Sequence, residues 1–563
     1  MRRIALVFLS LGALAGQPRF NVVEATIPQM RQAMEQHRVT SRELVTLYLT
    51  RIAMYEDKLH AVITVNPHAF EEADARDRER AEGHLRGPLH GIPVGLKDNI
   101  LTSGIVTTGG ALAFDGFMPP YDATLVKNLR DAGAVIIAKT QLTELANWVA
   151  GAPTPMPGNY NAVGGFGMNP YDPRRDPREG SNDGRPVLGT GGSSSGVGTA
   201  ANFWAANVGT ETSGSILSPS NQNMLAGIKP TVGRISRYGV IPITADQDTA
   251  GPMAKSVTDA AIMLGALESA SPDPNDPATN KCTPAPGRDY TRFLKADGLK
   301  GARIGIPRAA FYTVREEGRG PGGRGGGGGL NPEGAKVMAE AIEILRKQGA
   351  IVMDVEIPSM ASKDPANSFQ SWGQCGGSTG AKGKDANCSV VLKYGMKRDF
   401  NAFLKTLGAS APVKTLTELR VWNIEHTQSG AIRFGQSNLD VSDEMDVEAD
   451  KARYEADRAK DIRLAGTEGI DAAMKSNKLD ALVFPAANGA AIAAKPGYPT
   501  VIVPFGMVPN APMNPPLPEG FNAKPAPFGV SFTGMACSEP RLIELGFSFE
   551  QATRRRVPPP ALP

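Results

Sequence analysis

The chain has 563 residues, of which 41% are hydrophobic and 21% are charged. This composition is typical of a globular protein with a large core and excludes a disordered or low-complexity protein. Because 60 lysines and arginines nearly balance 57 aspartates and glutamates, we expect no nucleic-acid partner and no polybasic membrane contact.

The first fifteen residues have the features of a signal peptide. The basic pair Arg2-Arg3 precedes an apolar run over residues 4–14, and Ala13-Leu14-Ala15 forms a small-residue cleavage site before Gly16. This apolar run is too short to cross a bilayer comfortably, so we expect no stable membrane span. The sequence therefore predicts cleavage after residue 15 and export of the mature chain, either periplasmic or secreted. A short membrane anchor or a misassigned start codon is the alternative.

Helices and buried strands are expected to alternate along the chain. Thr40 and Glu43 form a capping box before a helix that runs to Tyr55, and a charged helix follows over about 67–82. Further expected elements are a strand within 90–100, a helix over 122–132, a strand over 134–138, a helix over 256–267, and strands over 479–485 and 498–504. This pattern indicates an α/β core.

Other segments are expected to be irregular or mainly helical. Residues 151–186 are dense in Gly, Pro, Asn and Asp and predict a long loop, a type of segment that is often functional. Residues 315–329 are low in complexity and predict a surface loop. Between two Gly/Ser clusters in the stretch 189–219 we expect a short apolar helix, and residues 335–475 are mainly helical in pattern.

Four cysteines allow disulfides in an exported protein. Cys375 and Cys388 bracket a loop rich in Gly and Lys and are the expected disulfide pair. Cys537 lies in a mostly apolar run and is expected to be a buried thiol. The chain contains no C-x-x-C or H-E-x-x-H pattern, so the sequence predicts no metal site and no cofactor.

Ser215 is a candidate nucleophile at the end of the sequence GTETSGS. The small residues before it leave backbone N–H groups open to a carbonyl oxygen, as in an oxyanion hole. The candidate donors are the backbone N–H groups of Thr212, Ser213, Gly214 and Ser215. No histidine lies nearby, so such a serine needs another base. A tight turn that caps a helix is the alternative interpretation.

The sequence contains two candidates for the base. Gly192 to Gly196 formally match G-x-S-x-G, which would make Ser194 the nucleophile with His426 as the base. That motif lacks the strong preceding strand that the hydrolase fold requires. Lys97 follows the apolar run HGIPVGL, and burial could lower its pKa enough for it to act as a base. Asp98 would oppose this only if it faced Lys97.

The motifs HGIPVGLKDNI, AGAVIIAKTQLTE, GTGGSSSGVGTAAN and GTETSGSILSPSNQNMLAGIKPTVGRIS occur in that order, and together they resemble the amidase signature family. The resemblance covers roughly residues 35–265 and is weaker in VFPA and PFGVSFTG. It implies a Ser–cisSer–Lys triad in which Ser215 is the nucleophile, Ser193 the bridging serine and Lys97 the base. No cofactor or metal is implied.

The resemblance also implies the architecture: a single large α/β domain over 16–563, with a mixed, mostly parallel β-sheet core covered by helices. Core motifs would occupy about 85–260. A variable, mainly helical region over about 270–475 would shape the substrate site, and about 476–550 would return to the core.

This chain departs from the family pattern in two places. Ser215 follows Ser193 by 22 positions, about two fewer than is common, which leaves Ser194 and Ser195 as alternatives for the bridging serine. Ser213 replaces a common Gly, and Leu217 replaces a common Arg.

Hydrolysis of linear amides through an acyl-enzyme is the expected function, with a small-molecule or peptide amide as substrate, such as a peptide C-terminal amide or an aryl acylamide. A carbamate or ester hydrolase of the same family, a His-dependent esterase and a catalytically silent binding protein are the alternatives. The sequence does not indicate an oligomeric state.

Overall fold

The computed structural model describes residues 20–180, 183–192, 196–314, 329–377, 382, 385–510, 515–560 and 562. The predicted signal peptide, most of the low-complexity run 315–329 and the serines at 193–195 lie outside these residues.

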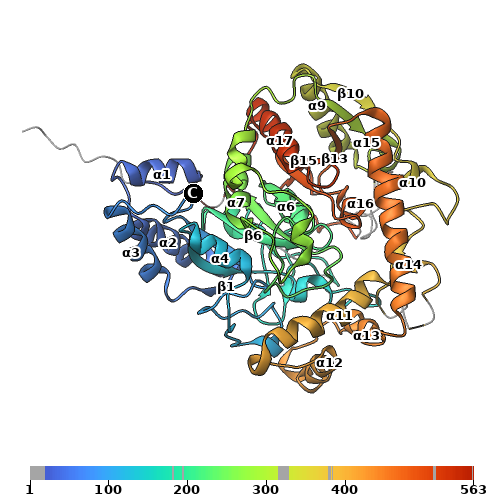
Figure 1. Cartoon of the computed structure of the whole chain (residues 1–563), viewed down its shortest axis with the longest axis horizontal. Coiled ribbons are helices and arrows are strands. Elements are labelled where there is room, and N and C mark those ends of the chain that lie inside the picture. The colour runs from blue at the N-terminus through green and yellow to red at the C-terminus, as the bar shows by residue number, and fades with distance from the viewer. Residues whose placement is uncertain are drawn as a thin grey trace, which may run out of the picture.

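One large sheet organises the described chain (Figure 1). Its eleven described strands follow the order β1-β3-β2-β6-β8-β7-β14-β15-β13-β9-β10. In that order they span Val62–Val65, Val135–Thr140, Pro93–Lys97, Ala206–Glu211, Thr249–Ala254, Ala226–Lys229, Thr500–Val508, Ala526–Thr533, Ala481–Pro485, Arg303–Ile306 and Ile351–Asp354. Two small pairs, β4 (Tyr160–Asn161) with β5 (Gly165–Phe166) and β11 (Gly373–Gln374) with β12 (Cys388–Ser389), lie outside it.

The sheet is mixed, and helices cover it. Parallel neighbours form two groups, β3-β2-β6 and β13-β9-β10, while the strands between these groups pair antiparallel. The α/β fold with a helix-covered mixed sheet is therefore confirmed, and its parallel part includes the strands that carry the first motifs. Strands β9 and β10 fall inside the region expected to be mainly helical and extend the sheet at its far edge.

Helices pack at both ends of the sheet and along its faces (Figure 1). Near the N-terminus lie α1 (Ile27–Glu35), α2 (Ser41–Leu59), α3 (Ala69–Ala81) and α4 (Thr124–Asp131). Beside the sheet lie α7 (Val257–Leu267), α9 (Pro332–Lys347), α16 (Ala490–Ala494) and α17 (Glu539–Thr553). An outer layer contains α11 (Val391–Thr406), α12 (Leu416–Glu425), α13 (Ser437–Asp443) and α14 (Lys451–Ile462). Shorter helices include α8 (Arg308–Phe311), α10 (Pro358–Ala361) and α15 (Asp471–Asn477).

Local sequence signals explain several helix boundaries. Thr40 caps α2 by accepting from the backbone N–H of Glu43, and the Glu43 carboxylate accepts in return from the N–H of Thr40 at 2.8 Å. Ser256 caps α7 through the N–H of Asp259. The short apolar helix expected between the two Gly/Ser clusters is α5 (Val197–Ala200). A turn and the buried strand β6 follow it before the second cluster.

Two disulfides connect the four cysteines. Cys375 pairs with Cys388, as expected. Cys282 pairs with Cys537 across 255 positions, so the interpretation of Cys537 as a buried thiol is wrong. Cys537 is only half-buried, because it lies in a turn between β15 and α17 rather than in the apolar strand before it.

The two ends of the described chain meet. Arg556 pairs with Glu24 at 2.7 Å, and Arg51 of α2 donates to the carbonyl oxygen of Leu562 at 3.2 Å. The C-terminus accordingly lies beside α1 in Figure 1. Among the helices that the structure describes, none combines the length and apolar character needed to cross a bilayer.

Candidate active site

Parallel strand pairing brings Lys97 close to the loop of Ser215. Strand β2 ends at Lys97, and its neighbour β6 ends at Glu211, with Leu96 of β2 opposite Val208 of β6. Because the two strands run in the same direction, their carboxyl ends lie at one edge of the sheet. The turn that contains Ser215 starts at this edge and leads into α6 (Leu217–Gln222).

Lys97 is fully buried, and its ammonium nitrogen faces β6. Nζ donates to the Oγ1 of Thr210 at 2.6 Å and to the carbonyl oxygen of Thr210 at 3.2 Å. Burial lowers the pKa of Lys97 to about 7, against the opposing effect of the Asp248 and Glu211 carboxylates. A neutral amine that uses both of its hydrogens on Thr210 keeps its lone pair for a proton.

Asp98 does not face Lys97. Its carboxylate lies 3.5 Å from Nζ of Lys139 and accepts from the N–H of Thr108 at 2.9 Å and from its hydroxyl. Neighbouring residues on an extended chain point to opposite faces, which separates the two groups. Asp98 is therefore the counter-ion of Lys139 and does not hold Lys97 in its protonated form.

The turn at 212–215 is shaped by a glycine and by a buried carboxylate. Gly214 has φ of +83°, a left-handed conformation that side chains other than glycine rarely adopt. The carboxylate of Glu211 accepts from the N–H groups of Ile216 at 2.7 Å and Leu217 at 3.0 Å. Glu211 thus caps the N-terminus of α6. Within the turn, Ser213 is exposed and Ser215 is half-buried.

The glycine-rich motif before α5 packs against the same helix. Gly191 has φ of +99°, and an added Cβ there would lie 2.3 Å from the backbone of Pro219 in α6. An added Cβ on Gly196 would lie 3.3 Å from the carbonyl oxygen of Pro219. Both flanks of the predicted bridging serine therefore lie beside α6. Ser193 itself, with its alternatives Ser194 and Ser195, lies outside the described residues.

A contact that the sequence did not indicate holds Thr212. Its hydroxyl donates to the Asp248 carboxylate at 2.5 Å, and the side chain of Gln247 donates to its carbonyl oxygen at 3.2 Å. Burial raises the pKa of Asp248 to about 6, despite the hydrogen bond from Thr212. Asp248 directly precedes β8, whose pairing with β6 sets Glu211 opposite Thr249. Only this strand register, which is not visible in the sequence, places Asp248 next to Thr212.

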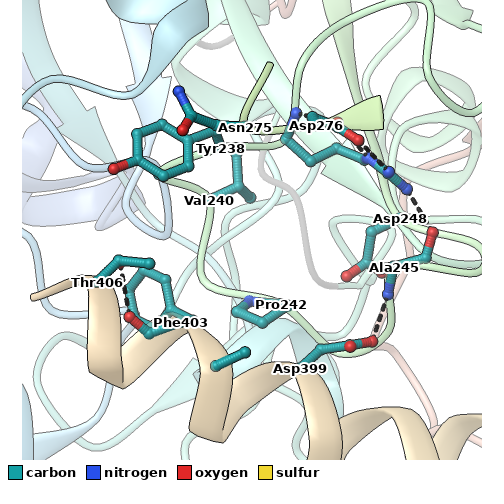
Figure 2. Close-up of a pocket in the computed structure, with 13 residues that line it drawn as sticks. Tyr238, Val240, Pro242, Ala245, Asp248, Asn275, Asp276, Asp399, Phe403 and Thr406 are labelled. Atoms are coloured by element: carbon teal, nitrogen blue, oxygen red, sulfur yellow. Dashed lines mark hydrogen bonds and ion pairs between the residues drawn. The ribbon is translucent and has the colours of Figure 1, made fainter. Parts of the chain in front are cut away.

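Asp248 also lines a cavity of about 180 Å³ between the 237–248 segment and α11 (Figure 2). Phe403 and Thr406 of α11 form part of one wall, and Tyr238 and Asn275 lie on the opposite side. The cavity is therefore bordered by the residue that holds Thr212.

The long loop over 151–186 lies next to the glycine-rich motif. An added Cβ on Gly158 would lie 3.4 Å from the Cα of Gly192. An added Cβ on Gly377, next to the Cys375–Cys388 disulfide, would lie 2.7 Å from the backbone nitrogen of Ala152. The loop and the disulfide segment thus pack together beside the candidate site.

His426 is engaged elsewhere. Its ring stacks on Trp422 at 3.8 Å between centroids, and its Nδ1 contacts the Trp422 carbonyl oxygen at 2.8 Å. Helix α12, which it follows, lies at the margin of the molecule, apart from α6 (Figure 1). The histidine required for the esterase hypothesis is thus away from the Gly/Ser motifs.

One group of described residues has metal-ligand spacing. The side chains of Cys375, Asp385 and Cys388 offer ligand atoms within 4.8 Å of one another. The two sulfurs are bonded to each other, and Asp385 pairs with Lys393 at 2.5 Å. The group therefore presents no thiolates to a metal ion.

Comparison with known proteins places these motifs in one family. The amidase family model matches residues 43–543. A protein of Arabidopsis thaliana described as a probable amidase is 34% identical over 546 residues, which is 96% of this chain and 92% of the relative. A putative amidase of Schizosaccharomyces pombe is 30% identical over 563 residues, which is 95% of this chain and 86% of the relative. The crystal structure of native peptide amidase from Stenotrophomonas maltophilia is 36% identical, with a TM-score of 0.77 over 95% of this chain and 98% of that chain.

The family match and the similarity to peptide amidase identify the chain as an amide hydrolase. The chain is a member of the amidase family, and the sequence-based assignment is confirmed.

Proposed function

We propose that the protein hydrolyses linear amides with Ser215 as nucleophile, Ser193 as proton bridge and Lys97 as base. The observation that carries this proposal is the placement of Lys97. It is buried at the end of β2, bonded to Thr210 of β6, and its pKa is lowered to about 7. A lysine with that pKa is about half neutral at pH 7, and this neutral fraction can accept a proton.

In the proposed reaction, Ser215 attacks the amide carbonyl while its proton passes through Ser193 to Lys97. The backbone N–H groups of the 212–215 turn stabilise the developing oxyanion. The proton returns to the leaving amine, and water then hydrolyses the acyl-enzyme on Ser215. No metal or other cofactor takes part in this scheme.

We propose peptide C-terminal carboxamides as the substrate class. Support comes from similarity to the peptide amidase of Stenotrophomonas maltophilia over nearly the full length of both chains. The loop at 151–186 and the disulfide segment at 375–388, which pack together beside the site, are the proposed walls of the substrate pocket.

Ammonia release from N-acyl dipeptide amides tests the activity and the substrate class together. Lys97→Ala and Ser215→Ala should each lower kcat at least about 1,000-fold. A fluorophosphonate should add its mass to Ser215 in the wild type and not in Ser215→Ala. If anilides, carbamates or esters turn over faster than peptide amides, the proposed substrate class would be wrong, while the proposed mechanism would stand. A fluorophosphonate-inert chain would favour a binding protein.

A serine scan tests the bridging residue. Ser193→Ala should abolish activity, because the proton of Ser215 then lacks a path to Lys97. Ser194→Ala and Ser195→Ala should keep most of it and serve as matched controls. Loss of activity in one of the controls alone would move the bridging role to that serine.

Export of the mature chain is also part of the proposal. Two disulfides are typical of proteins from oxidising compartments. N-terminal sequencing of protein collected outside the cytosol should give Gly16 as the first residue. A chain that keeps Met1 and remains in the cytosol would contradict export.

A further inference from the structure

The turn at 243–248 connects the outer helices to the candidate oxyanion loop. On one side it holds Thr212: the Asp248 carboxylate accepts from the Thr212 hydroxyl at 2.5 Å, and Gln247 donates to the Thr212 carbonyl oxygen at 3.2 Å. Thr212 is thus held at both its side chain and its backbone, one residue before the exposed part of the loop.

Asp248 is itself fixed in place. Its second oxygen accepts from the N–H groups of Ile243 at 2.8 Å and Thr244 at 3.0 Å. Asp248 also continues the antiparallel register of β8 with β6, in which Glu211 lies opposite Thr249. Its carboxylate can therefore shift little without shifting β8 as well.

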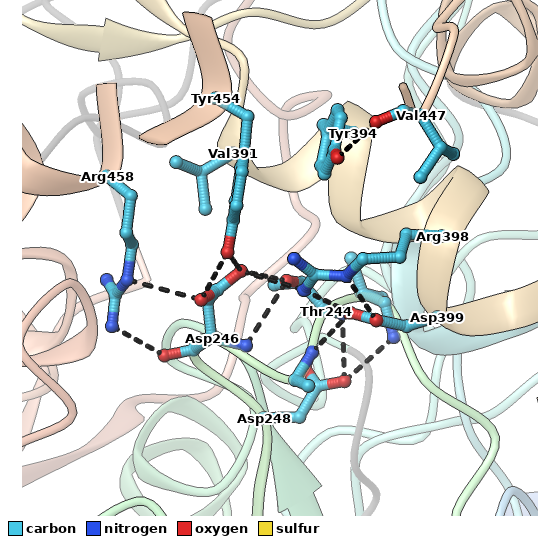
Figure 3. A network of polar contacts seen from close by, with 12 residues as sticks. Thr244, Asp246, Asp248, Val391, Tyr394, Arg398, Asp399, Val447, Tyr454 and Arg458 are labelled. Carbon is cyan, nitrogen blue, oxygen red and sulfur yellow. Dashed lines mark hydrogen bonds and ion pairs between the residues drawn. The ribbon is translucent and has the colours of Figure 1, made fainter. Parts of the chain in front are cut away.

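The other side of the turn is held by α11 and α14 (Figure 3). The Asp246 carboxylate forms ion pairs with Arg398 at 3.1 Å and with Arg458 at 3.3 Å. It also accepts a hydrogen bond from the hydroxyl of Tyr454 at 2.9 Å. The N–H of Ala245 donates to the Asp399 carboxylate at 2.7 Å. These helices lie more than 140 positions after the turn in the sequence, so only the fold brings the charges together.

We infer that Asp248 and Gln247 are positioning residues for catalysis: by fixing Thr212, they set the direction of the backbone N–H groups in the 212–215 turn. The inference rests on the proposed function, in which these N–H groups stabilise the oxyanion. Such donors act only when they are aimed in advance at the position that the oxyanion will occupy. A small rotation at Thr212 would turn them away while leaving the substrate pocket in place.

Substitution of Thr212 is the direct test. Thr212→Val keeps the shape and removes the hydroxyl that Asp248 holds, so kcat should fall about 10- to 100-fold with KM nearly unchanged. Thr212→Ser restores the hydroxyl and should recover kcat to within about threefold of the wild type. Gln247→Met releases the carbonyl oxygen of Thr212 and should lower kcat in the same way without a large change in KM.

Thr406→Val is the matched control. Thr406 lines the opposite wall of the cavity that Asp248 borders, and it contacts Tyr121, away from the turn at 243–248. The kcat of Thr406→Val should therefore stay within about twofold of the wild-type value. A folded Thr212→Val with unchanged kcat, or one that raises KM alone, would overturn the inference. If Thr212→Val does not fold, Gln247→Met decides by the same criteria. Ser215→Ala distinguishes a failure of the proposed function from a failure of this inference alone. Activity that survives in Ser215→Ala would refute the proposed function, and the inference with it.

Discussion

Lys97, the proposed catalytic base, also carries a penalty in stability. It is fully buried at the end of β2, and its amine donates to the hydroxyl and the carbonyl oxygen of Thr210 at 2.6 and 3.2 Å. Asp98, its neighbour in sequence, faces Lys139 instead. The same burial that suits the amine to the proposed role of base also makes its charged form unfavourable.

The pH dependence of activity should follow Lys97. Only the neutral amine accepts the proton, and its pKa is lowered to about 7 by burial, so kcat/KM should rise with pH through about 7 and level off above it. Below that point it should fall about tenfold per pH unit. A profile measured on a peptide carboxamide from pH 5 to 9 checks this. A profile that is flat across this range would contradict Lys97 as the base.

Replacement of Lys97 by Met should stabilise the protein while it abolishes activity. The folded pKa of about 7 lies below the unfolded value of about 10.4, so the unfolded chain binds more protons between these limits and wild-type stability rises with pH across that window. Near pH 7 the wild type bears a penalty of about 4 kcal/mol, so Lys97→Met should raise Tm by about 3 °C.

Thermal unfolding at two pH values measures this effect. The gain in Tm of Lys97→Met should shrink at pH 10, where the wild-type lysine is neutral in the folded state and the penalty has largely disappeared. A lower Tm in the variant at both pH values would show that the hydrogen bonds to Thr210 outweigh the penalty of burial.

At the scale of elements, the junction of β6 with α6 is the central structural feature. β6 lies between β2 and β8, and its end becomes the turn that bears Ser215. Glu211 closes this junction by accepting from the first free N–H groups of α6. Ser215, the proposed nucleophile, is thus placed by a strand, a carboxylate cap and a glycine, each with a separate physical role.

Loss of the cap should affect stability and catalysis together. Glu211→Ala leaves the N–H groups of Ile216 and Leu217 unpaired, so the free energy of unfolding should fall by about 1–2 kcal/mol. Since the turn then loosens, kcat should fall about tenfold or more. Glu211→Gln keeps one acceptor oxygen and should lose less of both. Denaturant unfolding and steady-state kinetics measure the two effects, and an unchanged kcat in Glu211→Ala would exclude this role.

Elements can be predicted from the sequence where a local signal exists. The capping box at Thr40 and the apolar run of β3 indicate the right elements because caps and buried strands have local sequence signatures. β6 escapes prediction because a short strand buried on both faces has no alternation that separates it from a helix. Lys97 and Ser215 can be named from motifs, whereas Asp248 depends on a strand register that no local pattern encodes.

At the scale of the whole molecule, a disulfide and an ion pair connect segments that are far apart in the sequence. The Cys282–Cys537 disulfide spans 255 positions, and Arg556 binds Glu24 near the first described residues. A basic cluster such as 554–556 at the end of a sequence is typical of a solvated tail, yet the Arg556 side chain is largely buried and also donates to the carbonyl oxygen of Met224. Long-range pairing of this kind depends on the completed fold, which explains why the sequence does not indicate it.

The two disulfides should differ in their effect on stability. In the chain-entropy model a closed loop stabilises more when it is longer, so Cys282→Ser should lower the free energy of unfolding by about 5.5 kcal/mol and Cys375→Ser by about 3 kcal/mol. Denaturant titrations of the two variants and the wild type measure this order. The reverse order would mean that native contacts around the 375–388 loop, rather than loop length, dominate.

The turn at 243–248 also has a consequence for protein engineering. An engineer who wishes to alter substrate range could exchange the outer helices for those of a relative, because α11 and α14 contact the turn at 243–248 and the outer helices do not carry Lys97 or Ser215. Arg398 and Arg458 belong to those helices, and Asp246 belongs to the framework that such an exchange retains. A chimera that keeps only one partner of these ion pairs would combine a new pocket with a misaligned turn at 212–215. Both partners therefore have to be exchanged together.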